Sequence, residues 1–508
     1  MVITFSLPPD PQPLSLGLHQ ALRLLSGLMQ GGKPLQAQAL AQALAEQAPD
    51  EPSVQVSLLR QLLLGSDFAG LERQARRALA LFPHLMPACL GLCLALRYRH
   101  AHLEACELLE NWLEDGGFGE AEKLALRHQL GVLQKELGLL AEAKANFDLC
   151  LAARPEMTEA YWSKADLGVP EERELAAMAE LYQSRPWPPQ AEAQLCYALG
   201  QGWERLGQAE PAFSWYQKGA RARRQVQPYD GEAARAELAK IQAAFPLGQA
   251  LSQAEAGQGP MPIFICGLPR SGTSLLEQLL SALPEVSALG ETVEMAQASQ
   301  QLLLAKGLAQ PFPDWVAALD KADWQALGDA YLQRIGPRCE GGWATDKMPM
   351  NFKAIGLIKQ ALPQARILHC RRAPMDNLWG CYKQLFADGA AFSYGLEDLA
   401  DYYLAYEQLM AHWHRLLPGQ ILDVQYETLV REPHQTLVGI LRFVGLGPSE
   451  ERIGQCLDFH HGGGAVPTLS ASQLRQGLSA GGIGRWRRFA PQLAPLRARL
   501  EAGGIAVD

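Results

Sequence analysis

The sequence predicts two structural classes in one chain of 508 residues: a repetitive α-helical region, then an α/β domain built on a parallel sheet. Three observations predict this. Residues before about 245 are rich in Ala, Leu, Gln and Glu and contain no convincing strand. In the later residues, short apolar segments alternate with helical ones. The stretch between the two regions consists largely of small and polar residues and is rich in glycine. We therefore expect domains at 1–248 and 261–508, joined by a linker at 249–260.

The helical region repeats with a period of about 34 residues. Small and aromatic residues recur in one order from Leu124 to Pro155 and again, about two periods later, from Ala193. The first copy has Leu130, Gly131, Ala143 and Phe147, and the second has Leu199, Gly200, Trp203, Ala212 and Tyr216. Small residues at fixed places let paired helices approach closely, so the pattern resembles tetratricopeptide repeats and predicts an α-solenoid. Such arrays commonly present surfaces to peptides, which predicts protein partners.

The elements of the second region follow from its periodicity. Strands are expected at 263–266, 366–370 and 420–425, and helices at 274–283, 324–335, 350–362, 376–386, 396–416 and 434–443. This alternation predicts a parallel sheet covered by helices, a three-layer arrangement in which ligands bind at the carboxyl ends of the strands.

The segment at 262–283 predicts a strand, a tight turn and a helix. Its apolar run stops at Gly267, and leucines then recur at helical spacing. Unpaired N–H groups at a helix N-terminus bind anions, and Gly272 lets the chain approach a phosphate closely. No lysine follows Gly272, so the loop lacks the β/γ-phosphate ligand of a nucleoside-triphosphate site. The polar side chains that it does offer are those of Arg270, Ser271, Thr273 and Ser274.

Composition excludes several classes of protein. A charged fraction of 19% with net charge −9 gives no basic excess for nucleic acid. The ten cysteines are scattered without a C-x-x-C pair, which favours reduced thiols over disulfides or a metal site. The N-terminal residues have neither a basic segment nor a long apolar one, so no signal peptide or membrane span is indicated. We expect a cytoplasmic enzyme without a metal.

The string PRSGTS resembles the 5'-phosphosulfate-binding loop of sulfotransferases, enzymes that use 3'-phosphoadenosine 5'-phosphosulfate (PAPS). The resemblance implies a P-loop-like sulfotransferase fold over about residues 261 to 490, with PAPS as co-substrate. It assigns PAPS binding to Arg270, Ser271, Gly272, Thr273 and Ser274.

Three further segments carry the transfer chemistry that the resemblance implies. Glu291 in ALGETVEM matches the catalytic base of the tyrosylprotein branch of the family. Lys347 in WATDKMPMNF matches a lysine that reaches the bridging oxygen, and the neighbouring Asp346 is expected to orient its ammonium. Ser470 in VPTLSASQLRQG matches a serine that helps to stabilise the transition state, together with Arg270.

The string ILHCRRAPMDNLWGCYKQLF resembles the family's 3'-phosphate motif and departs from it twice. Arg372 matches the arginine, whose planar fork suits a phosphate. Ala373 replaces the usual aspartate, and Gly380 stands where the phosphate-binding serine is expected. Either the N–H of this glycine compensates, or a nearby Ser or Cys does, or PAPS binding is weakened. Tyr426 and Arg485 match family residues near the cofactor.

Three candidate functions are consistent with the sequence to different degrees. The first is a sulfotransferase that acts on a hydroxyl or phenol; a tyrosine in a peptide or protein is the leading acceptor, because the Glu291 and Lys347 segments resemble the tyrosylprotein branch. The second is a repeat scaffold whose C-terminal domain is degenerate and binds nucleotide weakly. A small-molecule kinase is disfavoured by the missing loop lysine. The oligomeric state stays open, with a homodimer as one option.

Overall fold

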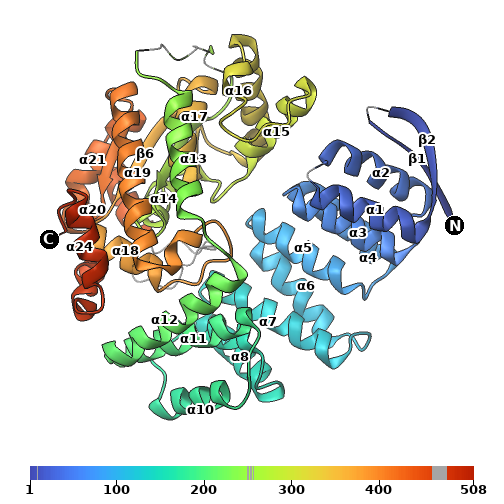
Figure 1. Cartoon of the computed structure of the whole chain (residues 1–508), viewed down its shortest axis with the longest axis horizontal. Helices are drawn as coiled ribbons and strands as arrows, with labels where there is room; N and C mark the ends of the chain where they lie inside the picture. The colour runs from blue at the N-terminus through green and yellow to red at the C-terminus, as the bar shows by residue number, and fades with distance from the viewer. Residues whose placement is uncertain are drawn as a thin grey trace. The chain divides into compact units, whose positions relative to one another are not determined.

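The chain divides into two compact units, Met1–Cys150 and the residues from Leu151 onward. The structure is a computed structural model and describes residues 1–8, 10–31, 33–248, 251, 254–255, 257–459 and 477–507 (Figure 1). The predicted linker at 249–260 therefore lies inside the second unit.

The first unit begins with an antiparallel hairpin, which the sequence analysis did not predict. Strands β1 (Val2–Leu7) and β2 (Asp10–Gly17) pair along their length. In β1 the side chains of Ile3 and Phe5 are buried and their neighbours are exposed, the alternation typical of a strand with one face on a core. The expectation that no strand precedes residue 245 was therefore wrong, because a single short alternating run is a weak signal beside a long helical pattern.

Helices make up the rest of the first unit, and from α1 to α7 each packs against the next. They are α1 (Leu18–Gln30), α2 (Pro34–Gln47), α3 (Pro52–Leu64), α4 (Phe68–Leu81), α5 (Met86–Tyr98), α6 (His102–Glu114), α7 (Glu120–Leu137) and α8 (Leu140–Ala153). A Cβ built on Gly131 of α7 would lie 2.7 Å from Cε1 of Phe147 on α8. The glycine therefore lets the two helices approach closely, as the repeat pattern predicted.

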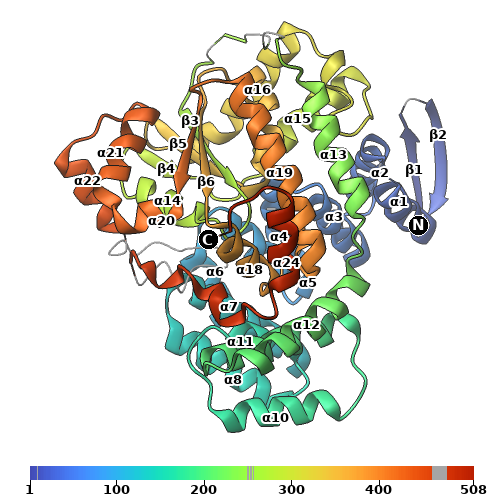
Figure 2. The ribbon, with the colours of Figure 1, turned by 60° about the vertical axis from the view of Figure 1, so that its left-hand side comes forward.

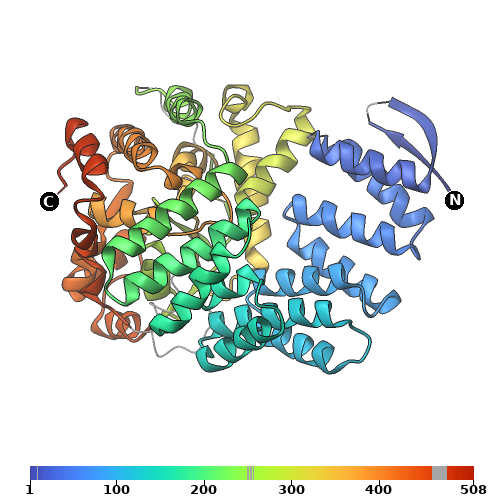
Figure 3. The ribbon, with the colours of Figure 1, turned by 60° about the horizontal axis from the view of Figure 1, so that its bottom comes forward.

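The second unit opens with helices of the same kind. They are α9 (Thr158–Lys164), α10 (Glu172–Gln183), α11 (Pro189–Arg205), α12 (Ala209–Val226) and α13 (Gly231–Ala244). Gly200 on α11 faces Tyr216 on α12 as Gly131 faces Phe147. These helices share one hydrophobic core with the α/β part, beside which they lie in Figure 3. The ring of Phe213 stacks on Trp379, and Tyr197 Oη donates to the carbonyl of Tyr382 at 3.1 Å.

Five parallel strands form the sheet at the centre of the second unit, in the order β4-β5-β3-β6-β7 (Figure 2). They are β3 (Met261–Gly267), β4 (Val286–Ala288), β5 (Trp343–Lys347), β6 (Arg366–Arg371) and β7 (Ile421–Gln425). Strands β3, β6 and β7 confirm the three expected strands. Strands β4 and β5 were not predicted, since β4 has three residues and β5 ends on two charged ones. Lys347 pairs in register with Ile265, so it ends an interior strand.

Helices cover both faces of the sheet, as the predicted three-layer arrangement requires. Figure 2 shows α14 (Thr273–Ser281), α21 (Pro433–Val444) and α22 (Glu450–Leu457) on one side, and α16 (Lys321–Ile335) and α19 (Leu396–Leu416) on the other. The remaining helices are α15 (Glu294–Lys306), α17 (Ile355–Ala361), α18 (Pro374–Tyr382), α20 (Tyr426–Arg431) and α24 (Ala494–Ala502). Within the described part of the chain, every helix is too short or too polar to cross a membrane.

Candidate active site

The loop after β3 has the backbone of an anion-binding turn. Gly267 has φ of 145°, and a Cβ there would lie 2.4 Å from the carbonyl oxygen of Cys370 on β6. Arg270 and Gly272 also have positive φ, of 67° and 107°, and Gly272 is the N-cap of α14. A Cβ on Gly272 would meet the ring of Tyr426 at 2.8 Å, so only glycine fits. The turn thus leaves the first N–H groups of α14 at the loop, where an anion is favoured.

Two buried donors at this loop have no hydrogen-bond partner among the described residues. They are the hydroxyl of Ser271 and the Nε of Arg372, which follows β6. Nη1 of Arg372 donates to the carbonyl of Arg270 at 3.0 Å, and Nη2 donates to that of Gly482 at 2.7 Å. Because buried polar groups are nearly always satisfied in native proteins, unpartnered donors beside an anion-binding turn indicate an anion site.

Electrostatics support this assignment. Burial, and then the charge of Arg372, lower the pKa of Arg270. Two guanidinium groups held close together disfavour each other's charge, and a bound anion relieves that repulsion. Thr273 and Ser274 lie in the first turn of α14, which begins one residue before the start expected from the sequence.

A carboxylate and an ammonium meet beside the loop. Oε1 of Glu291 lies 2.7 Å from Nζ of Lys347. The side chain of Lys347 is 2% exposed and that of Glu291 is 51% exposed. The backbone N–H of Lys347 donates to the carbonyl of Gly290 at 3.0 Å, which ties the Glu291 loop to the end of β5. The structure therefore brings the two predicted catalytic residues together, with the carboxylate open to solvent and the ammonium beneath it.

Glu277 on α14 is a site residue that the sequence analysis missed. Its Oε1 accepts hydrogen bonds from the N–H of Gly290 at 3.1 Å and from Thr345 Oγ1 at 3.2 Å. Burial raises the pKa of this carboxyl, while the nearby Lys347 lowers it. A glutamate inside the leucine run SLLEQLL was the available signal, because an acid on a buried helix face needs a specific partner.

Asp346 does not contact Lys347, which corrects an expectation. Its carboxylate accepts from Tyr331 Oη and from Asn351 Nδ2, both at 3.0 Å. Successive residues of a strand point to opposite faces, so the neighbour of Lys347 in β5 cannot orient its ammonium. Burial raises the pKa of Asp346 to about 7.

Part of the chain is similar in sequence to a known protein family. Residues 262–450 match the model described as "Sulfotransferase family". Residues 262–450 thus form a sulfotransferase-family domain. A protein-tyrosine sulfotransferase 2 from Gallus gallus is 24% identical over 47% of this chain and 68% of its own length.

A further relative is similar to most of this chain, and a solved structure is similar to about half of it. A protein of Aquifex aeolicus (strain VF5), named "Uncharacterized protein", is 27% identical over 80% of this chain, and the chain spans about half (54%) of that protein's length. Among solved structures, the sulfotransferase domain of the Synechococcus PCC 7002 olefin synthase is 21% identical, with TM-score 0.32, over 49% of this chain and 98% of its own. The fold assignment itself rests on the strand order described above.

Helix α18 of the sulfotransferase domain packs against the anion-binding loop. Asn377 Nδ2 donates to the carbonyl of Pro269 at 2.8 Å, and Cys381 Sγ lies 3.1 Å from the same oxygen. A Cβ built on Gly380 would lie 3.2 Å from Cβ of Arg270. A side chain at this position would therefore press on Arg270, and the glycine makes room for the arginine stem.

The remaining predicted residues have different positions. The guanidinium carbon of Arg372, the arginine predicted to bind the 3'-phosphate, lies 4.6 Å from the ring centroid of Tyr426, so the ring packs against that guanidinium. Arg485 is exposed, and its Nε donates to the carbonyl of Gly481 at 2.5 Å. Ser470 lies outside the described residues.

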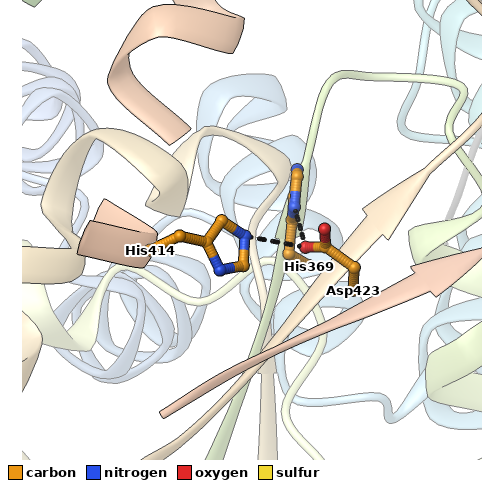
Figure 4. A group of neighbouring side chains, drawn as sticks. All are labelled: His369, His414 and Asp423. Carbon is orange, nitrogen blue, oxygen red and sulfur yellow. Dashed lines mark hydrogen bonds and ion pairs between the residues drawn. The ribbon is translucent and has the colours of Figure 1, made fainter. Parts of the chain in front are cut away.

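A second group of polar side chains links β6, β7 and α19 (Figure 4). Oδ1 of Asp423 accepts from His369 Nδ1 at 2.7 Å and from His414 Nε2 at 3.0 Å. The other ring nitrogen of His369 bonds to Tyr406 Oη, and Nη1 of Arg371 lies 3.7 Å from Asp423 Oδ2. The side chains of His369, His414 and Asp423 lie close enough together to hold a metal ion. Because both nitrogens of His369 are already paired and a guanidinium is adjacent, we assign them to a structural hydrogen-bond network.

Proposed function

We propose that this protein is a PAPS-dependent sulfotransferase that moves a sulfuryl group to a hydroxyl or phenol. One observation carries the proposal. The loops after β3, β4, β5 and β6 bring an anion-binding turn, two unpartnered buried donors and the Glu291–Lys347 pair to one edge of the sheet. Ligands bind at this edge in parallel α/β sheets.

The residues present suit a nucleotide with two phosphate positions. The 268–274 loop offers N–H groups and hydroxyls to the 5' side, and Arg372 would hold the 3'-phosphate. When bound, PAPS supplies a sulfuryl group attached to a phosphate that leaves with the bonding electrons. The smaller charge of a sulfuryl group, compared with a phosphoryl group, makes positioning and cations sufficient.

The chain's own residues then have separate roles. Glu291 takes the proton of the acceptor hydroxyl while the oxygen of that hydroxyl bonds to sulfur. Lys347 stabilises the negative charge that develops on the oxygen leaving sulfur, and Arg270 holds the group in line. Glu277 is a positioning residue, because it ties Gly290 next to the base to Thr345 near the lysine.

The acceptor that we propose is a phenol, a tyrosine in a peptide or protein. The likeness to protein-tyrosine sulfotransferases supports this choice. The half-exposed Glu291 is compatible with a bulky acceptor approaching from solvent. The helical repeats suit peptide recognition, which gives them a role in acceptor choice.

Calorimetry with adenosine 3',5'-bisphosphate and a transfer assay test the proposal together. The wild type should bind the nucleotide, and Arg270→Ala should weaken binding about tenfold or more, because a charged hydrogen bond to phosphate is lost. Transfer of labelled sulfate to tyrosine peptides should fall about 10²–10⁴-fold in Glu291→Ala, while nucleotide binding persists. The exposed Glu340→Ala serves as the control.

Two results would contradict the proposal. A wild type that binds no nucleotide would favour the repeat-scaffold function instead. Full turnover in Glu291→Ala would remove that residue from the role of base. Parallel assays with magnesium and ATP should give no phosphoryl transfer, since the loop lacks the nucleoside-triphosphate lysine.

A further inference from the structure

Lys383 lies beside the position where the 3'-phosphate hydroxyl is missing. It is the C-cap of α18, three residues after Gly380, and residues three apart lie on the same face of a helix. Its Nζ forms an ion pair with Oε1 of Glu204 on α11 at 2.6 Å. Glu204 is held in turn by Tyr216 Oη, which donates to its Oε2 at 2.8 Å. The helical region of the second unit thus fixes a lysine next to the nucleotide loop.

The charges around Lys383 indicate an anion site. Burial lowers the pKa of this lysine and Glu204 raises it, while Arg270 and Arg485 lower it further. Lys383 is therefore within electrostatic reach of two cations that belong to the proposed cofactor site. Arg372 lies within electrostatic reach of Arg270 in turn, since its charge lowers the pKa of Arg270. A phosphate bound beside these cations would favour their charged forms, which burial and mutual repulsion disfavour.

We propose that Lys383, held by Glu204, binds the 3'-phosphate of the nucleotide in place of the absent helix hydroxyl. The inference rests on the proposed function. Gly380 leaves room for the stem of Arg270, so the hydroxyl at that position is lost, and an ammonium one turn later on the same helix face supplies the interaction. An ammonium has three donors and can bridge a carboxylate and a phosphate at once. The helical region thereby contributes a positioning residue to the nucleotide site.

The test compares two nucleotides that differ by the 3'-phosphate. Calorimetry measures the affinity of adenosine 3',5'-bisphosphate and of adenosine 5'-monophosphate for the full-length wild type and for Lys383→Met. The affinity for the bisphosphate should fall about 10- to 100-fold in the variant, the loss expected for one charged hydrogen bond. The affinity for the monophosphate should change by less than about twofold, since the 5' loop is intact.

Two further variants make the result specific. Lys383→Met leaves the mostly buried Glu204 without its cation, so the double variant Lys383→Met/Glu204→Gln removes both charges and should show the same selective loss. Lys353→Met is the matched control, because Lys353 likewise pairs with a glutamate of the helical region, Glu237 on α13, at 2.8 Å. It should leave both affinities unchanged.

Each outcome separates the two proposals. If the wild type prefers the bisphosphate and Lys383→Met retains the full preference, the role of Lys383 is refuted and the proposed function stands. If the wild type binds the two nucleotides equally, the chain does not recognise the 3'-phosphate, and the inference fails although the 5' site remains. If it binds neither nucleotide, the proposed function itself fails.

Discussion

At the residue scale, two buried acids at the end of β5, Glu277 and Asp346, bond to groups on opposite faces of the strand. Glu277 bonds to Gly290 and Thr345 on the side of Lys347, and Asp346 bonds to Tyr331 and Asn351 on the other side. Strand alternation separates them, since Asp346 and Lys347 are successive residues. Only Glu277 can therefore tune the proposed transfer centre, and Asp346 affects the stability of the fold.

Asp346→Asn should change how stability depends on pH. Burial raises the pKa of Asp346 from 3.8 to about 7, so the folded state holds this proton more tightly than the unfolded state. The contribution of Asp346 to the free energy of unfolding therefore falls as pH rises from about 4 to about 7, by at most about 1.4 kcal/mol per pH unit. Asp346→Asn lacks this loss. Its free energy of unfolding should therefore rise relative to that of the wild type over the same pH interval.

Urea denaturation at several pH values measures this difference. Asp388→Asn is the control at an exposed position, and its curve should run parallel to that of the wild type. A constant offset between Asp346→Asn and the wild type across the interval would contradict the assignment.

At the scale of elements, glycines set the distance between paired helices. Gly131 faces Phe147 in α7 and α8, and Gly200 faces Tyr216 in α11 and α12. The same small-and-aromatic contact occurs in both copies at the same sequence spacing. The repeat is therefore a packing rule as well as a sequence pattern.

Gly200→Ala should destabilise the protein although alanine is the better helix former. The new Cβ would lie 2.7 Å from Cδ1 of the buried Tyr216, and overpacking of this kind costs about 1–3 kcal/mol. Gly439→Ala in α21 is the matched control, because nothing lies within 4 Å of its Cβ position. It should gain up to about 1 kcal/mol. Urea unfolding of the two variants gives both values, and equal stabilisation by both would refute the packing argument.

At the scale of the whole molecule, part of the helical region belongs with the sulfotransferase domain. Helices α11 to α13 share one core with it, through residues such as Phe213 on Trp379 and His412 on the carbonyl of Phe245. Glu204 reaches Lys383 from the same helices. We propose that residues from 151 onward fold as one body, while the repeats before residue 150 form a separate one.

Truncation tests this division. A fragment of residues 151–508 should fold cooperatively and bind adenosine 3',5'-bisphosphate with an affinity close to that of the whole chain. A fragment of residues 249–508 should aggregate or unfold, because it exposes the apolar surface that α11 to α13 cover. Circular dichroism and calorimetry measure both properties. A stable, nucleotide-binding 249–508 fragment would instead support the boundary expected at 249–260.

The sequence predicted the elements with strong periodicity and missed those without it. Helix α19 was predicted to the residue, and β3, β6 and β7 to within two residues. Strand β5 was missed because Asp346 and Lys347 interrupt its apolar pattern, although both side chains are buried in a strand that lies between β4 and β3. The leucine run around Glu277 indicates only that this acid needs a buried partner, and its partners Gly290 and Thr345 come from other elements.

The sequence by itself determined the class of the chain, the anion-binding loop and the candidates Arg270, Glu291, Lys347 and Arg372, because turn chemistry and short motifs are local. Only the tertiary structure decided which side chains meet. Glu291 pairs with Lys347, and Glu277 bonds to the Gly290 N–H beside them. Asp346 bonds to Tyr331 on the opposite face of β5, and Glu204 pairs with Lys383. These contacts join residues up to 179 positions apart, and no local pattern specifies them.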